Sequence, residues 1–218
     1  MSFPIKACVV GGIGCVTAVA VGLAQPKYSP TLLEKWGEEG YELISSKEKV
    51  AEEVWKARAT IYKGTANEWL LNDLSKESVD EKGDKIKERC EEYKNKKTRV
   101  KDIGEANYEK VTALCTLNIG EYLKSHLSGQ DKVISDINNN EDIWKANFKK
   151  YEDEIKKKFK NTTEDKATEV LSKFCADTFK LHHSNKHKED RINASLWCIK
   201  REKEPSKLPV AEAPPKDP

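Results

Sequence analysis

Apolar side chains recur at intervals of three or four residues along much of the chain, which is the spacing of one helical face. The clearest stripe consists of Trp144, Phe148, Tyr151, Ile155 and Phe159. Lysine and glutamate fill most of the positions between them, so this stretch predicts one long amphipathic helix. No stretch sustains the alternation of apolar and polar residues that is typical of a half-buried strand. We therefore expect an all-α protein with little or no sheet.

The helical pattern occurs twice along the chain. Trp55 and Tyr62 are seven residues apart in the first half, as are Trp144 and Tyr151 in the second half. The tryptophans lie in the similar segments EVWKA and DIWKA, and an upstream LIS is matched by VIS. These matches predict a duplication into two similar helical-bundle units. We expect the four aromatic residues to be core residues of the repeat rather than exposed binding aromatics, because their partners also repeat at helical spacing.

Four of the six cysteines occupy matched places in the two predicted units. Cys90 and Cys115 are 25 residues apart, and Cys175 and Cys198 are 23 residues apart. Four thiols permit three pairings, and the duplication favours one disulfide within each unit, Cys90–Cys115 and Cys175–Cys198. Each bridge would stabilise its unit by about 3 kcal/mol. The alternative is four buried free thiols acting as small hydrophobic residues. Zinc is disfavoured, because no two of these cysteines have close ligand spacing.

The N-terminal residues 7–24 carry no charge. As a helix these residues rise about 27 Å, close to the ~30 Å hydrocarbon thickness of a bilayer. We expect residues 4–25 to be a transmembrane anchor, or a signal peptide cleaved after Ala24. Lipoprotein processing at Cys15 fits poorly, because the apolar run continues past it. Each alternative places the rest of the chain outside the cytoplasm: extracellular at the cell membrane if anchored, secreted if cleaved.

The C-terminal end has a different composition. Residues 204–218 contain five prolines, and proline at that density does not continue a helix. We expect a disordered, Pro-rich tail there. The predicted order is a signal peptide or transmembrane anchor at 1–25, a first helical unit at 26–130, a second at 131–203, and the tail at 204–218.

Composition and motifs point away from most enzyme classes. Charged residues make up 35% of the chain, but 39 basic and 37 acidic residues leave a net charge of +2. This balance is unlike the strong basic excess of nucleic-acid binders, so we expect no nucleic-acid partner. A phosphate loop and a nucleophile motif are both absent from the sequence. We therefore predict no catalytic residue and no cofactor.

One histidine cluster is the exception that we consider. His182, His183 and His187 are close in sequence, and His183 and His187 are one helical turn apart. They are weak metal-ligand candidates, because no carboxylate stands in a His-Glu-x-x-His arrangement. The alternative is a solvated helix end. If the metal site formed, the chain would be a secreted metal-dependent hydrolase.

Three motifs together resemble a known group of proteins. They are GYELIS at residues 40–45, the Trp…Tyr helix that begins near Trp55, and the terminal LWC at residues 196–198. With the apolar N-terminal segment, they resemble the uncharacterised proteins that haemotrophic mycoplasmas encode in large paralogous families. The resemblance implies a bacterium without a cell wall, a single membrane and an outward-facing ectodomain. It implies no catalytic residue.

The functional prediction follows from these features. We expect a membrane-anchored extracellular helical protein, either a surface antigen or a module that interacts with a host-cell protein. The alternatives are the metal-dependent hydrolase above and a structural scaffold that self-associates through exposed helix faces. The sequence does not separate the antigen from the scaffold.

Overall fold

A computed structural model of the protein describes residues 29–64, 71, 74–134 and 140–201. The predicted N-terminal anchor, with Cys8 and Cys15, and the predicted tail both lie outside the described residues. Within the part that is described, no helix combines the length and the apolar character needed to span a bilayer.

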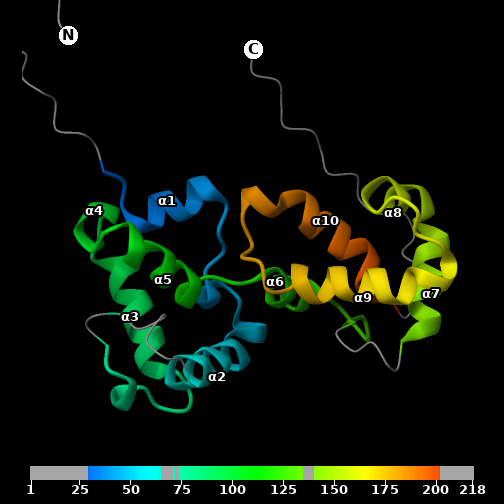
Figure 1. The fold of residues 1–218 in the computed structure, drawn as a ribbon. Helices are drawn as coiled ribbons and strands as arrows, with labels where there is room; N and C mark the ends of the chain where they lie inside the picture. The colour runs from blue at the N-terminus through cyan, green and yellow to red at the C-terminus, as the bar shows by residue number, and fades with distance from the viewer. Residues whose placement is uncertain (1–28, 65–70, 72–73, 135–139, 202–218) are drawn as a thin grey trace, which may run out of the picture.

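The described residues are mostly helical, which confirms the all-α prediction at this level (Figure 1). Short 3₁₀ turns join several of the helices, among them η1 (Ile44–Ser46) and η4 (Asn185–His187). The α-helices of the described part are α1 (Leu32–Glu39), α2 (Glu48–Gly64), α3 (Asp84–Asn95), α4 (Val100–Ile103), α5 (Glu105–Cys115), α6 (Ile119–His126), α7 (Glu141–Lys150), α8 (Glu152–Lys158), α9 (Ala167–Thr178) and α10 (Lys188–Trp197). Two strands, β1 (Lys132–Val133) and β2 (Ile199–Lys200), form a small antiparallel pair.

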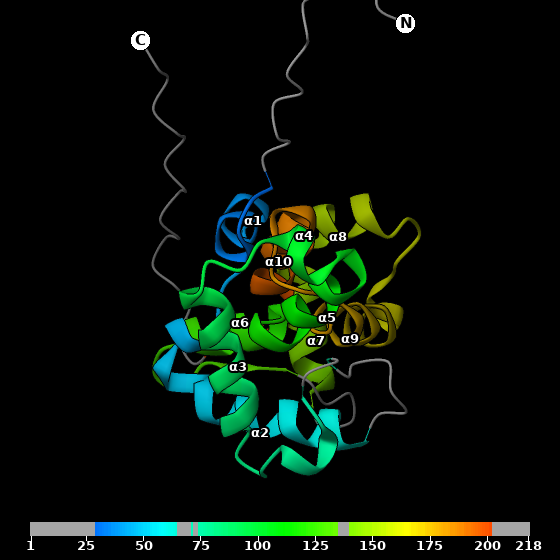
Figure 2. The ribbon, with the colours of Figure 1, turned by 90° about the vertical axis from the view of Figure 1, so that its left-hand side faces the viewer.

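The buried apolar side chains form two clusters. The first cluster extends from Leu32 to Leu117 and the second from Ile119 to Ile199. In Figure 1, α1–α5 gather on one side and α7–α10 on the other, with α6 between them. Figure 2, seen from the side of the first cluster, shows α1 and α2 at opposite ends of that cluster. The chain passes from one core to the other at Asn118, whereas the predicted division into units stands at residue 130.

Capping boxes fix where two of these helices begin. At the start of α1, the Thr31 hydroxyl accepts from the Glu34 backbone N–H, and the Glu34 carboxylate accepts from the Thr31 N–H. Asn118 and Glu121 make the same reciprocal pair at the start of α6. Each box satisfies two backbone groups that a helix end leaves without partners. The second box therefore holds α6 at the crossing between the two cores.

Each cluster contains one disulfide, with the predicted pairing. Cys90 of α3 is bonded to Cys115 of α5, and their Cα atoms are 5.5 Å apart. Cys175 of α9 is bonded to Cys198 after α10, with Cα atoms 5.7 Å apart. Both bridges are buried in their cores. The alternative of four free thiols therefore does not apply to this structure.

Three of the four predicted core aromatics are core residues. Trp55, Tyr62 and Trp144 are 4%, 0% and 1% exposed, which argues against Trp55 and Trp144 as exposed binding aromatics. Tyr151 is half-buried, and the long helix predicted through it is wrong. It lies between α7 and α8, with a non-helical φ of −123°.

The charge pattern gives a physical reason for this break. Two lysines end α7, and the acidic residues Glu152, Asp153 and Glu154 form the first turn of α8. Basic residues are favourable at a helix C-terminus and acidic residues at an N-terminus. This order of charges supports a new helix start at Glu152. Tyr151 still packs against the second cluster, but it is only half-buried there.

Candidate binding site at the seam between the two clusters

A loop of the second cluster lies against the first cluster. We call this contact the seam; it consists of residues 179–187 on one side and, on the other, residues 38–42 and 116–118 of the first cluster together with residues 119–122 at the start of α6. Backbone hydrogen bonds hold it together: the His183 N–H donates to Leu117 O (3.0 Å), and the Ile119 N–H donates to Leu181 O (2.8 Å). The Asn185 side-chain amide donates to Glu38 O at 3.1 Å.

The backbone at Gly40 allows this close approach. Gly40 ends α1 with φ = 73°, a left-handed conformation that favours glycine. A Cβ at this position would lie 2.4 Å from the Asn185 side-chain oxygen. A larger residue here would strain the backbone and displace the Asn185 side chain that bridges the two clusters.

His183 occupies the middle of the seam. Its imidazole stacks on the ring of Tyr122, with centroids 3.9 Å apart and an interplanar angle of 28°. Nδ1 lies 3.1 Å from Gly40 O, and Nε2 contacts the guanidinium of Arg191. A carbonyl accepts and a guanidinium donates, so these partners select the neutral ring with its proton on Nδ1. Burial and the neighbouring Arg191 charge lower the pKa of His183.

His182 faces the first cluster from the same loop. Its Nδ1 lies 3.5 Å from the Thr116 hydroxyl, and its ring meets Tyr41 edge-on with centroids 6.2 Å apart. Burial lowers the pKa of His182, and the nearby positive charge of Arg58 lowers it further. Both adjacent histidines are therefore held neutral at the seam.

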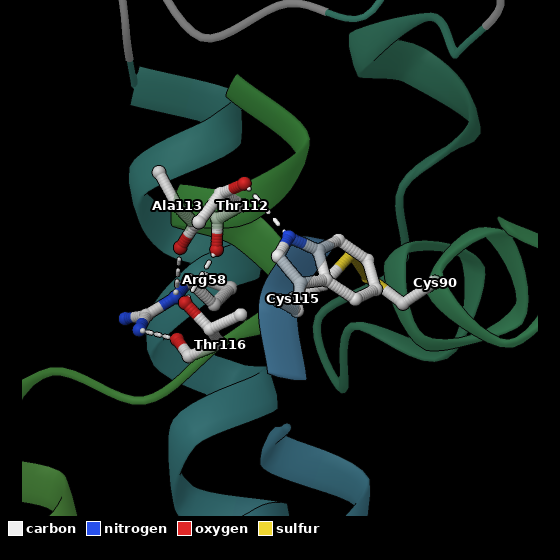
Figure 3. Close-up of a disulfide and its surroundings, with 7 residues drawn as sticks. Arg58, Cys90, Thr112, Ala113, Cys115 and Thr116 are labelled. Carbon is white, nitrogen blue, oxygen red and sulfur yellow. Dashed lines mark hydrogen bonds between the residues drawn. A yellow bond between two sulfur atoms is a disulfide. The ribbon is translucent and has the colours of Figure 1, made fainter. Parts of the chain in front are cut away.

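A buried ion pair underlies His182. The Arg58 guanidinium donates two hydrogen bonds to the Glu121 carboxylate, each 2.8 Å long. It also donates to Ala113 O and Thr116 O, both at 3.1 Å. Figure 3 shows the Arg58 guanidinium between these two carbonyls, near the end of α5 that carries Cys115. The ion pair thus joins α2, the end of α5 and α6.

Sequence reasoning missed this ion pair, although a signal existed. Arg58 is three residues after Trp55 and four before Tyr62, so it belongs to the apolar stripe of α2. A charged residue within such a stripe is buried only when it is paired. Its partner could not be found from the sequence, because Glu121 is 63 residues away.

A cavity opens beside His182. Its volume is about 420 Å³. Its walls come from the first cluster and the seam loop, and they include Tyr41, Tyr108, Glu109, Thr112, His182 and Lys186. This lining offers aromatic faces and hydrogen-bonding groups of both charges. The arrangement is suited to holding a polar ligand.

The tyrosines of the cavity are not poised to act as acids or bases. Tyr108 donates its hydroxyl proton to Glu39 (2.7 Å), and Lys35 lies 4.1 Å from the centre of its ring. Burial, followed by the bond to Glu39, raises the pKa of Tyr108. Burial and the charges of Glu39 and Glu109 raise the pKa of Tyr41. Both phenols therefore stay protonated at neutral pH and serve as hydrogen-bonding groups.

The three histidines do not form a metal site. His183 has both ring nitrogens engaged by Gly40 and Arg191, and His182 faces Thr116. His187 lies instead beside Asp190 of its own cluster, at 3.8 Å. Within the described ranges, no three histidine, cysteine, aspartate or glutamate side chains gather in a metal-binding arrangement. The expectation of a solvated helix end is also wrong, because His183 is 6% exposed in a loop between α9 and α10.

Comparison with known proteins assigns no family or function to this site. No family model, curated protein or solved structure matches the chain.

Proposed function

We propose that this is an exported protein, held at the cell membrane by residues 4–25, whose described residues form an extracellular binding module. The observation that carries the proposal is the pair of disulfides, one in each core. Disulfides persist in oxidising, extracytoplasmic environments and are rare in a reducing cytosol. Cleavage of the N-terminal segment would make the same module a secreted one.

We further propose that the module arose by duplication. Leu43 pairs with Thr116, the residue after the second cysteine of the first cluster. Val133 pairs in the same way with Ile199, the residue after Cys198. These are the positions that the LIS and VIS matches align.

A second correspondence supports the duplication. The third residue after each repeat tryptophan donates from its helix to the end of the helix that leads to the second cysteine. In the first cluster this residue is Arg58, which donates to Ala113 O and Thr116 O. In the second it is Asn147, which donates to Trp197 O at 2.8 Å. The duplicated framework accounts for a module built of two stabilised cores with a seam between them.

Binding is a better supported activity than catalysis or scaffolding. The seam cavity brings together groups that hold a polar ligand, whereas the histidines required for a metal-dependent hydrolase have separate partners. Among the described residues, the large apolar side chains that are exposed, Leu33, Ile61 and Ile192, lie on three different helices. Single exposed apolar residues are common on protein surfaces and do not form a self-association face. The resemblance to the mycoplasma families points to a host-cell protein as partner and to a role as a surface antigen.

The location is tested on intact cells that make the full chain. Protease added outside should remove the described module, and mass spectrometry of non-reduced digests should find the Cys90–Cys115 and Cys175–Cys198 peptides linked. A cytoplasmic protein of the same cells serves as the control for leakage. A protected module with four free thiols would refute export.

The binding role is tested separately. Labelled full chain should bind intact host red cells and lose binding after trypsin treatment of the cells. Lys186→Glu, at the rim of the cavity, should weaken binding, whereas the matched charge reversal Lys157→Glu on exposed α8 should not. Equal binding to untreated and trypsin-treated cells would refute a protein partner. Equal binding by both variants would show that the partner binds at a surface other than the cavity.

A further inference from the structure

We propose that the seam is a pH-sensitive joint: protonation of His182 and His183 in mild acid releases residues 179–187 from the first cluster, while both cores stay folded. This inference rests on the geometry of the seam and is independent of the proposed function. Its chemical basis is that a positively charged guanidinium lies near each imidazole: Arg191 contacts His183, and Arg58 lies near His182.

The hydrogen bonds of His183 require the neutral ring. Nδ1 faces Gly40 O, and Nε2 faces the guanidinium of Arg191. Arginine donates hydrogen bonds and does not accept them. A second proton on His183 would therefore place an N–H against an N–H, with two positive charges in contact. Movement of the loop away from Arg191 or Gly40 relieves this conflict.

His182, on the same loop, would also gain its proton close to a positive charge. The guanidinium of Arg58 is fixed beneath it by two hydrogen bonds to Glu121. The Glu121 carboxylate also accepts the Asn118 N–H at 2.9 Å. Because Glu121 is already engaged by Arg58 and Asn118, it offers little compensation to a charged imidazole.

The remaining charged neighbours do not reverse this balance. Glu42 favours a charged His183, but its carboxylate is paired with Lys47 at 2.7 Å. Tyr122 stacks on His183, and its ring also contacts that of His126 at a tilt. The titratable and charged groups around His183 are Glu42, Arg191 and Tyr122, and His126 contacts Tyr122. Those around His182 are Arg58, Glu121, Tyr41, His187, Glu109 and Lys186.

The direction of the pH effect follows from linkage. Both histidines have a pKa below the usual value of about 6.5 while the seam is closed. Once the loop is released, each regains that usual value and binds a proton more readily. The opening equilibrium therefore rises as the pH falls below about 6.5, by up to about tenfold per pH unit for each histidine. At neutral pH both rings are neutral and the seam is closed.

The experiment is hydrogen–deuterium exchange of the oxidised full chain in mild detergent, read by mass spectrometry. Exchange at about pH 7.5 and about pH 5.5, corrected for the intrinsic rate, brackets the range in which histidine titrates. Peptides covering 117–123 and 179–186 should lose protection in acid, by up to about tenfold for each histidine. Peptides from the cores, at 108–114 and 167–174, should keep theirs. Unchanged seam peptides, or equal losses in seam and core, would overturn the proposal.

Variants assign the effect to the two histidines. The double substitution His182→Gln with His183→Gln should abolish the loss of seam protection in acid. Arg191→Met keeps both histidines but removes the opposing charge, so it should reduce the loss at least about threefold. Lys188→Met is the matched control from the same helix as Arg191; Lys188 is exposed and lies outside the seam, and the variant should behave as the wild type. If the double variant does not fold, Arg191→Met decides, and a full wild-type response in that variant refutes the joint.

Discussion

The two cores carry residues of different charge at one matched position. Three residues after its tryptophan, the first core places Arg58, and the second places Asn147. Asn147 donates to a carbonyl of its own core, Trp197 O. Arg58 donates to the end of α5 and also binds Glu121 on α6. The neutral residue therefore closes one core, while the charged residue ties the first core to the helix that begins the second.

This difference shows what each matched position contributes beyond packing. A buried guanidinium requires an anion as well as carbonyl acceptors, because its charge is costly in a core. The capping box of α6 supplies that anion through Glu121. A neutral amide requires no such partner, so the second core has no equivalent link. The first core is consequently the one whose stability depends on its neighbour.

The largest expected loss of stability comes from breaking the Arg58–Glu121 link. Arg58→Met retains the volume of the side chain but leaves the Glu121 carboxylate and two carbonyls without their partner. Removal of one member of a buried ion pair costs about 3–5 kcal/mol. Asn147→Leu, which loses one hydrogen bond, should cost about 1 kcal/mol. Urea unfolding of the oxidised full chain, in detergent and followed by circular dichroism, measures both free energies of unfolding.

The control for this pair of variants is Lys56→Met. Lys56 lies on the exposed face of the same helix and pairs with Glu52 at 2.7 Å, with both side chains at least half exposed. An exposed pair of this kind contributes up to about 1 kcal/mol. If Arg58→Met cost no more than Lys56→Met, Arg58 would not be the link between the cores.

Removing the disulfide should lower stability to a similar extent in each of the two cores. Replacement of Cys90 and Cys115 by alanine opens a loop whose ends are 25 residues apart, and replacement of Cys175 and Cys198 opens one of 23. Each change should lower the free energy of unfolding by about 3 kcal/mol, because the unfolded chain regains freedom. Losses measured in urea should be equal within about 1 kcal/mol. A markedly larger loss in one core would show that the other retains its structure without a bridge.

Removing the hydroxyl should lower the stability of the protein more at Tyr62 than at the matched Tyr151. The Tyr62 hydroxyl donates to Leu74 O (2.7 Å) and accepts from the Leu71 N–H (3.0 Å), and all three residues are buried. Tyr62→Phe leaves both backbone groups without this partner and should cost about 1–3 kcal/mol. Tyr151→Phe, at a half-buried position, should change stability by less than about 0.5 kcal/mol. Equal costs by thermal unfolding would mean that the helix break at Tyr151 does not alter its role.

The spacing of apolar residues and of cysteines along the chain was sufficient to predict several helices and both disulfides. The stripe containing Trp55 and Tyr62 predicted α2, and the matched cysteines predicted both disulfide pairings. The same reasoning failed at Tyr151, because equal spacing places two residues on one face only while the helix continues. There the order of charges in Lys149, Lys150 and Glu152 was a local signal against continuity.

The seam could not be predicted because its contacts join residues far apart in the sequence. His183 and Gly40 are 143 residues apart, and Thr116 and His182 are 66 apart. In a chain with 35% charged residues, a histidine-rich stretch looks like solvated surface. Its burial depends on how two independently stabilised cores dock, and helical periodicity carries no information about docking.

The smallest expected effect concerns the tyrosines on the seam side of the first cluster, and it appears in alkali. The pKa values of Tyr41 and Tyr108 are raised above the usual value of about 10, mainly by burial. The folded protein thus retains protons that the unfolded chain loses, so its stability falls as the pH rises above about 10. Tyrosinate absorbance should show Tyr41 and Tyr108 among the groups that ionise late, and Tyr108→Phe should remove one of them. Because Tyr108→Phe also removes one source of this linkage, its stability should fall less steeply with pH than that of the wild type. An unchanged slope would mean that the Glu39 contact, and with it the polar wall of the cavity, is not maintained in solution.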